Sequence, residues 1–167
     1  EHAALTAFAM DLPPNGQIAD DGDVIELGDT RVELFKTPGH TVGVLSMRYP
    51  VVDGKDTHTA ITLGGIGLNF DGVEQTESYL ESYRRLQQSL ASQASVSLPN
   101  HARMGRVFER AKALQTRGAG EAHPFVDKSS LRKDIAGYIK AAEKKLEAEK
   151  NGTAKSALEE LAGATQK

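Results

Sequence analysis

Thr37-Pro38-Gly39-His40-Thr41 is the stretch around which the fold of this chain is organised. Within residues 31–36 polar and apolar side chains alternate for four residues, and residues 42–49 form a second strand-like run. The pentapeptide is therefore expected to join two strands. Proline fixes its own φ and restricts the residue before it, while glycine reaches backbone angles that other residues avoid. A single histidine is usually an ordinary surface or core residue. An imidazole held this firmly is nevertheless typical of a metal ligand, which must be oriented before the metal binds.

The composition is that of one ordinary globular domain. The chain has 167 residues, of which 39% are hydrophobic and 26% are charged. Its formal net charge of -3 argues against nucleic acid or an anionic membrane as the main partner. No apolar run approaches the roughly 20 residues of a membrane span. The absence of cysteine excludes disulfides and thiolate metal ligands. The start at Glu1, without a methionine, fits a mature, processed or trimmed polypeptide.

The remaining periodicity predicts a mixed α/β layer over residues 1–150, followed by a polar tail at 151–167. Further strands are expected at 24–27, 59–63 and 96–98, the first forming a hairpin with the strand before His40 through Gly28-Asp29. Three helices are expected. The first has Thr76 as N-cap, and its apolar face is Tyr79, Leu80, Tyr83, Leu86 and Leu90. The apolar face of the second is Met104, Val107, Phe108, Ala111 and Leu114. The third is capped by Ser129 or Ser130, and its apolar face is Leu131, Ile135, Tyr138, Ile139, Ala142 and Leu146.

His101 repeats the pattern of His40. It follows the short strand at 96–98, is preceded by Pro99, and stands before a helix. Two histidines at the strand ends of one sheet are expected to meet at the same edge, where α/β sheets carry their sites. Neutral imidazole suits zinc, but a catalytic zinc needs about three protein ligands and an open position. His40 and His101 therefore predict part of a metal site. A helix-start polar residue is the alternative reading of His101.

Four segments follow one another along the chain: Thr37-Pro38-Gly39-His40-Thr41-Val42-Gly43, Leu63-Gly64-Gly65-Ile66-Gly67-Leu68-Asn69, Pro99-Asn100-His101 and His123-Pro124-Phe125-Val126-Asp127. In this order they resemble the C-terminal half of the metallo-β-lactamase superfamily. The resemblance covers roughly residues 20–145 and is greatest to the third subclass of metallo-β-lactamases, whose zinc site uses histidine and aspartate without cysteine. It implies half of an αβ/βα sandwich, with a mixed, largely antiparallel sheet and helices on one face.

The resemblance also implies a function. Two zinc ions would sit at the sheet edge, with His40 on the first and His101 on the second, and a zinc-bound hydroxide would open a β-lactam amide. The other ligands would come from an N-terminal His-x-His-x-Asp-His motif, which this chain does not contain. The implied partners are thus the N-terminal half of the same fold and a small-molecule substrate, with no nucleic acid and no membrane. The implied location is periplasmic or secreted.

Two departures from the family pattern leave alternatives open. Relatives that hydrolyse glutathione thioesters carry a metal-bridging aspartate at the strand end where this chain has Gly64-Gly65, and the third lactamase subclass often has serine at Gly65. Asn69 is expected to contact a substrate carbonyl or carboxylate, or else to cap its loop. His2, His58 and His123 are expected to be surface histidines. The alternatives are a non-catalytic half-domain that binds a partner or itself, and a lactone or ester hydrolase on the same fold.

Overall fold

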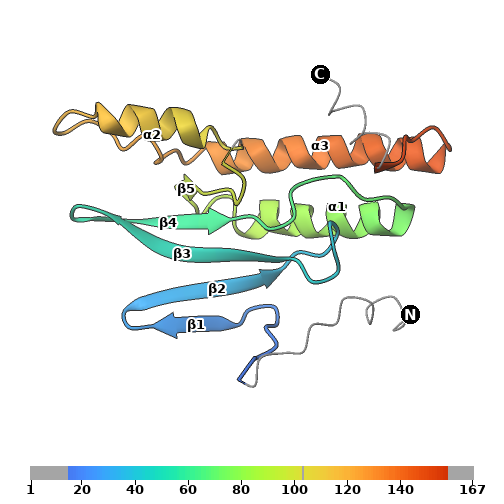
Figure 1. Ribbon diagram of the computed structural model, residues 1–167, viewed down its shortest axis with the longest axis horizontal. Helices are drawn as coiled ribbons and strands as arrows, with labels where there is room; N and C mark the ends of the chain where they lie inside the picture. Colours follow the sequence, from blue (N-terminus) through green and yellow to red (C-terminus); the bar gives the residue numbers. More distant parts are fainter. Residues whose placement is uncertain (1–14, 103, 158–167) are drawn as a thin grey trace.

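The computed structural model describes residues 15–102 and 104–157, and it forms one sheet with helices packed against it (Figure 1). The expectations for His2 and for residues 158–167 of the tail lie outside this range. The elements in chain order are β1 (Val24–Leu27), β2 (Thr30–Lys36), β3 (Leu45–Asp53), β4 (Asp56–Thr62), α1 (Val73–Ser89), β5 (Val96–Ser97), α2 (Val107–Gln115) and α3 (Ser130–Lys150). The five strands lie side by side in the order of the sequence. The pairs from β1 to β4 are antiparallel, whereas β4 and β5 are parallel.

This architecture confirms the predicted mixed α/β fold and the hairpin between β1 and β2. Leu27 pairs with Thr30, so Gly28 and Asp29 form the tight turn, with Gly28 at a positive φ of 64°. The strand after the His40 loop starts at Leu45, three residues later than predicted. The backbone N–H of Thr37 donates to Val44 O across 2.9 Å, which closes residues 38–43 into a loop before the β2–β3 ladder begins.

The core lies between one face of the sheet and helices α1 and α3, which run side by side (Figure 1). It confirms the apolar faces predicted for the first and third helices. Its fully buried side chains include Ile61 of β4, Tyr79, Tyr83 and Leu86 of α1, and Leu131 and Ile135 of α3. Burying a side chain of this size stabilises the fold by about 1.5–3 kcal/mol. The same core sets the position of the strand ends that carry the histidines.

The N-terminus of α1 differs from the prediction. Thr76 is not the N-cap; the helix begins at Val73, after Gly72, and Thr76 is buried in its first turn. The Thr76 hydroxyl donates instead to a carboxylate oxygen of Glu149, from α3, across 2.7 Å, and the Gly72 N–H donates to the other oxygen across 3.1 Å. A tertiary contact thus replaces the local side-chain cap.

The second predicted helix is shorter than expected and is not a core helix. It begins at Val107, after Arg106 in the left-handed region at φ 57°, and none of its residues is buried. Its predicted apolar face is largely in solvent, with the Phe108 side chain 66% exposed. Helical periodicity therefore identified the helix but not the element against which it packs.

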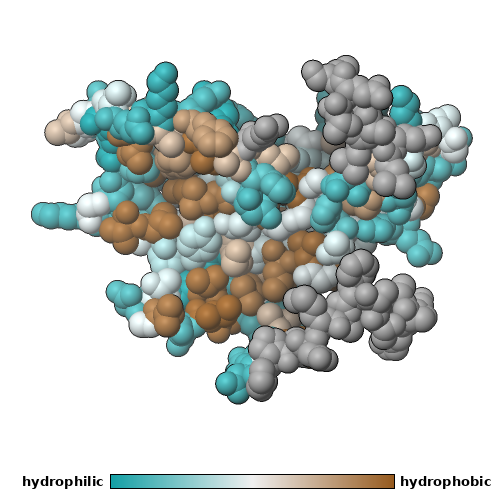
Figure 2. Space-filling view, in the orientation of Figure 1, coloured by the Kyte–Doolittle hydropathy of each residue, from teal (hydrophilic) through white to brown (hydrophobic). Residues whose placement is uncertain are grey.

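Over strands β1 and β2, none of the described helices covers the second face of the sheet. We call Ile25, Leu27, Val32 and Met47 the open face, because strand pairing and alternation place these four side chains on the side opposite Ile61 and none of them is buried. Leu27 is 81% exposed and Ile25 is 55% exposed. Figure 2 shows hydrophobic side chains gathered over the strands on the face in view. None of the described helices is both long and apolar enough to span a membrane.

Candidate metal centre

The loop that carries His40 is anchored at both ends. Thr37, directly after β2, and Ser46 of β3 are buried, and their hydroxyl oxygens are 2.9 Å apart. The Ser46 hydroxyl also accepts a hydrogen bond of 3.1 Å from the backbone N–H of Gly64. This connects the His40 loop to the strand end at Gly64-Gly65, so the two segments keep a constant spacing.

His40 is held through its side chain. Its Nδ1 lies 2.9 Å from the carbonyl oxygen of Gly67, and because a carbonyl only accepts, Nδ1 carries the proton. This tautomer leaves the lone pair on Nε2, which is the arrangement that histidine metal ligands usually have. The imidazole also packs against the Phe70 ring in a T-shaped arrangement, with ring centroids 6.2 Å apart and planes at 78°.

Two glycines permit this placement. A Cβ on Gly39, whose φ is 143°, would lie 2.4 Å from the Cα of Tyr79 in α1. A Cβ on Gly65, whose φ is 57°, would lie 2.8 Å from the Cβ of His40. Real Cβ atoms do not approach this closely, so the loop can sit on α1 and beside Gly65 only where both side chains are absent. The space beside His40 at this strand end therefore has no room for a serine or aspartate at residue 65 with the present backbone.

His40, Asn69 and His101 line one pocket of about 260 Å³. The structure thus brings together both sequence-predicted metal ligands and the predicted substrate contact, and the other lining residues are Gly65, Ile66, Gly67, Asn100 and Met104. Asn69 lies over Gly67, since a Cβ there would be 2.5 Å from its side-chain oxygen. His101 is exposed, and its imidazole makes no hydrogen bond with the described part of the chain. The two histidines are therefore held to different degrees.

The donor set fits part of a zinc site. Two imidazoles, one of which already donates its Nδ1–H to a carbonyl, are suitable zinc ligands. Within residues 15–102 and 104–157, however, no three His, Cys, Asp or Glu side chains gather in a group that could hold a metal ion. The remaining ligands of such a site must come from outside these residues.

The other two described histidines lie elsewhere. His58 and His123 line a mainly apolar pocket of about 280 Å³ with Val51, Val96 and Phe125. The carboxylate of Asp53 in the same pocket pairs with Arg117 across 2.9 Å, and this hydrogen bonding lowers the Asp53 pKa from its ordinary value. The structure does not bring His58 or His123 into the pocket of His40.

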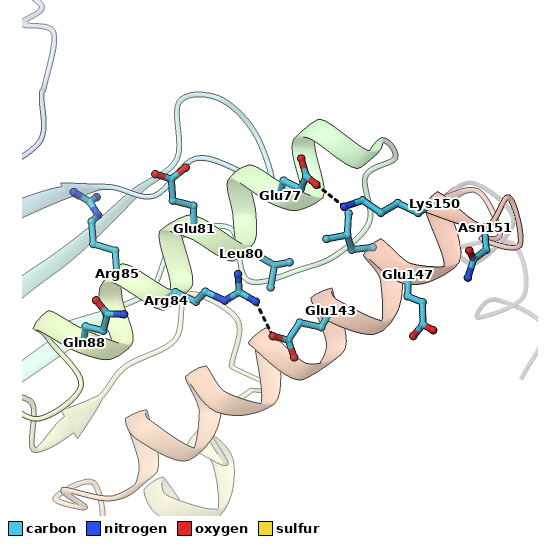
Figure 3. Close-up of a pocket in the computed structure, with 11 residues that line it drawn as sticks. Glu77, Leu80, Glu81, Arg84, Arg85, Gln88, Glu143, Glu147, Lys150 and Asn151 are labelled. Carbon is cyan, nitrogen blue, oxygen red and sulfur yellow. Dashed lines mark hydrogen bonds and ion pairs between the residues drawn. The ribbon is translucent and has the colours of Figure 1, made fainter.

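A larger groove, of about 1060 Å³, lies between α1 and α3 (Figure 3). Its charged side chains pair across the groove, with Arg84 on Glu143 and Lys150 on Glu77, each at 2.7 Å. No histidine lines it. We interpret it as a solvent-filled groove between two packed helices.

Three residues of α1 that the sequence analysis did not assign to the site hold the His40 loop. The Gln75 side-chain N–H donates to His40 O at 3.0 Å, and the Ser82 hydroxyl donates to Pro38 O at 2.7 Å. The Tyr79 hydroxyl donates to Ile66 O at 3.0 Å. The spacing of 75, 79 and 82 places all three on one side of a helix, and this spacing is the sequence signal that could have identified them. Of these three residues only Tyr79 was predicted from the sequence, and it was predicted as part of the apolar core.

No family model matches this chain. Hydroxyacylglutathione hydrolase of Mesorhizobium japonicum is 39% identical over 56 residues, which are 34% of this chain and 21% of that protein. The metallo-β-lactamase FEZ-1 of Legionella gormanii has a similar structure, with a TM-score of 0.69 and 25% identity over 78% of this chain and 50% of that one. The subclass B3 metallo-β-lactamase BJP-1 of Bradyrhizobium japonicum matches in fold, with a TM-score of 0.68 and 19% identity over 81% of this chain and 52% of that one.

The chain thus spans about half the length of the lactamases and about a fifth of the length of the curated hydrolase that it matches. The sequence and structure comparisons lead independently to hydrolases of the same fold, and the sheet and helices agree with the predicted half-sandwich. The chain is therefore similar in fold to metallo-β-lactamases and similar in sequence to a hydroxyacylglutathione hydrolase.

Proposed function

We propose that this chain is half of a zinc-dependent hydrolase that opens a β-lactam amide. The observation that carries the proposal is the meeting of His40 and His101 in one pocket, with the Nε2 of His40 left free by the hydrogen bond from Nδ1 to Gly67. Lactamases with a similar fold support the choice of substrate.

In this proposal His40 and His101 each hold one of two zinc ions. Zinc supplies a Lewis acid and lowers the pKa of water, so that water can attack a carbonyl at neutral pH. The chain itself orients His40 through Gly67. Asn69, at the rim of the same pocket, donates through its amide to a carbonyl or carboxylate of the substrate.

The proposed partner is the other half of the fold, which carries the His-x-His-x-Asp-His ligands. The open face supports this, because a contiguous apolar surface on a sheet usually marks an interface. The complete enzyme is proposed to act in the periplasm or outside the cell, as the lactamase resemblance implies.

A thioester hydrolase is the second candidate, and the curated hydroxyacylglutathione hydrolases favour it. Gly65 argues against the thioester hydrolase, although the serine that is frequent in the third lactamase subclass is absent here as well. Thioester-hydrolysing relatives place an aspartate at this strand end, and here a side chain at residue 65 would collide with His40. A lactone or ester hydrolase and a non-catalytic half-domain are further outcomes of the test.

The test uses the complete protein with any companion chain that purifies with it, identified by intact mass. Metal analysis is expected to give two zinc ions per site, and the double variant His40→Ala, His101→Ala is expected to lose zinc. Unchanged zinc content in the double variant would contradict the metal assignment. His58→Ala is the matched control, because His58 lies outside the pocket, and it should keep both ions.

The substrate is tested with the same preparation. A chromogenic cephalosporin, S-lactoylglutathione and a set of lactones are compared by kcat/KM. We expect the cephalosporin to be turned over fastest. A faster thioester would favour the second candidate, and a folded, zinc-free protein without turnover would favour the non-catalytic half-domain.

A further inference from the structure

Helix α1 contacts the His40 loop through the loop-facing stripe, which is Gln75, Tyr79 and Ser82. Successive loop residues meet successive members of the stripe: Gln75 donates to His40 O, and Ser82 donates to Pro38 O. Between them, the Cα of Tyr79 lies against Gly39, where only a glycine fits. The helix therefore holds the backbone of residues 38–40 at every residue.

Tyr79 also acts on the other side of His40. Its hydroxyl donates to Ile66 O across 3.0 Å, and the next carbonyl, Gly67 O, is the acceptor for His40 Nδ1 at 2.9 Å. Burial raises the pKa of the Tyr79 hydroxyl, which keeps it protonated as a donor. One side chain therefore supports both the backbone that carries the imidazole and the peptide that orients its ring.

We propose that the loop-facing stripe of α1 is a positioning unit for His40, which selects the tautomer with the proton on Nδ1 and thereby presents Nε2 as the metal-binding nitrogen. Gln75 and Ser82 fix the loop, and Tyr79 fixes the carbonyl that accepts the Nδ1 proton. The value of this positioning for catalysis rests on the proposed function, but the choice of tautomer does not.

The test compares two tyrosines. Tyr79→Phe and Tyr83→Phe each remove one buried hydroxyl that donates to the 64–67 segment, the first to Ile66 O at 3.0 Å and the second to Gly64 O at 3.1 Å. The two rings are stacked, with centroids 4.2 Å apart, so both variants alter the same part of the core. A purely structural role predicts the same effect for both variants.

The readout is the tautomer of His40 in the complete, metal-free protein. It is measured from the ring nitrogen NMR shifts of isotope-labelled histidine at mildly alkaline pH and assigned with His40→Gln. We expect the Nδ1–H form to predominate in the natural protein. The ratio of the two tautomers should fall roughly three- to tenfold in Tyr79→Phe, the scale of one hydrogen bond, and stay unchanged in Tyr83→Phe. Equal ratios in all three proteins, or an equal fall in both variants, would overturn the proposal.

Gln75→Ala gives a second test at a half-buried position, and it applies even if Tyr79→Phe does not fold. Its matched control is Gln88→Ala, an exposed glutamine of the same helix whose side chain makes no hydrogen bond with the described residues. The His40 tautomer ratio should fall in Gln75→Ala and stay constant in Gln88→Ala. Identical ratios in both variants would contradict the role of Gln75.

Zinc affinity separates this inference from the proposed function. Loss of an outer contact to a zinc ligand typically weakens metal binding by about 10- to 100-fold. We expect at least the lower figure, roughly tenfold, for Tyr79→Phe and no change for Tyr83→Phe. If the natural protein binds no zinc, the proposed function fails, and the tautomer measurement still decides whether the stripe positions His40.

Discussion

At the scale of single residues, Gly39 decides how closely the His40 loop approaches α1. A side chain there would collide with the backbone of Tyr79 at 2.4 Å, and backbone atoms cannot move aside as the end of a flexible side chain can. Gly43, in the same loop, has open space around the position of a Cβ. The two glycines therefore have different roles, although both stand in the pattern that carries the family resemblance.

We expect Gly39→Ala to lower the free energy of unfolding by about 2–4 kcal/mol, because overpacking and left-handed strain add. Gly43→Ala is the matched control and should change it by less than about 0.5 kcal/mol. Urea denaturation of the complete protein measures both. Equal stability of the two variants would show that the loop does not pack on Tyr79 as the structure has it.

At the scale of elements, the start of α1 depends on α3. The Glu149 carboxylate accepts hydrogen bonds from the Gly72 N–H and the Thr76 hydroxyl, and Lys145 forms an ion pair with the same carboxylate at 3.2 Å. Its side chain is only 7% exposed, so the contact is shielded from solvent. The beginning of the predicted tail is also attached here, because the N–H of Ala157 donates to Asp71 at 2.9 Å. α3 thus fixes the helix that holds the His40 loop.

We expect Glu149→Ala to lower the free energy of unfolding by about 1–2 kcal/mol, the scale of a lost helix cap with a negative charge at the N-terminus. Glu147→Ala removes an exposed carboxylate from the same turn of α3 and should have little effect. Thermal and urea unfolding give the comparison. A Glu149→Ala protein as stable as Glu147→Ala would contradict the tertiary cap.

At the scale of the whole molecule, ion pairs connect the sheet to the helices. Asp21 accepts two hydrogen bonds from Arg85 of α1, at 2.7 and 3.0 Å, and one from the Lys36 N–H at 2.7 Å. Hydrogen bonding from Arg85 lowers the pKa of Asp21, and hydrogen bonding from Ser129 lowers that of Asp127. Burial raises the pKa of Asp134, so the pH dependence that this group gives to stability is opposite to that of Asp21 and Asp127.

This predicts an acid-sensitive fold. An aspartate whose pKa is lowered in the folded state binds fewer protons there than in the unfolded chain, so its stabilisation is complete above about pH 4. We expect that stabilisation to be lost as the pH falls from about 4 through the lowered pKa. Unfolding measured against pH should show a shallower acid decline for Asp21→Asn than for the control Asp29→Asn. Asp29 is exposed in the β1–β2 turn and makes no ion pair with the described residues. Parallel acid declines in the two variants would contradict the role of Asp21.

The sequence by itself determined the local features of this protein. Alternation and turn residues predicted the strands and the Gly28-Asp29 hairpin, and proline and glycine restrictions marked His40 and His101, because these signals depend on the residue and its immediate neighbours. The convergence of the two histidines could also be expected, since strands of one sheet that run in the same direction end at the same edge, as β2 and β5 do here.

Only the tertiary structure decided what holds and covers these features. The cap of α1 comes from Glu149, which accepts a hydrogen bond from the amide of Gly72, 77 residues earlier in the chain. The tautomer of His40 is set by the carbonyl of Gly67, 27 residues away. α2 has a helical apolar pattern but no buried residue. Periodicity shows which side of a helix is apolar, but it does not show whether another element packs against that side. Packing between distant segments has no local signature, which is why the positioning of His40 by α1 required the folded structure.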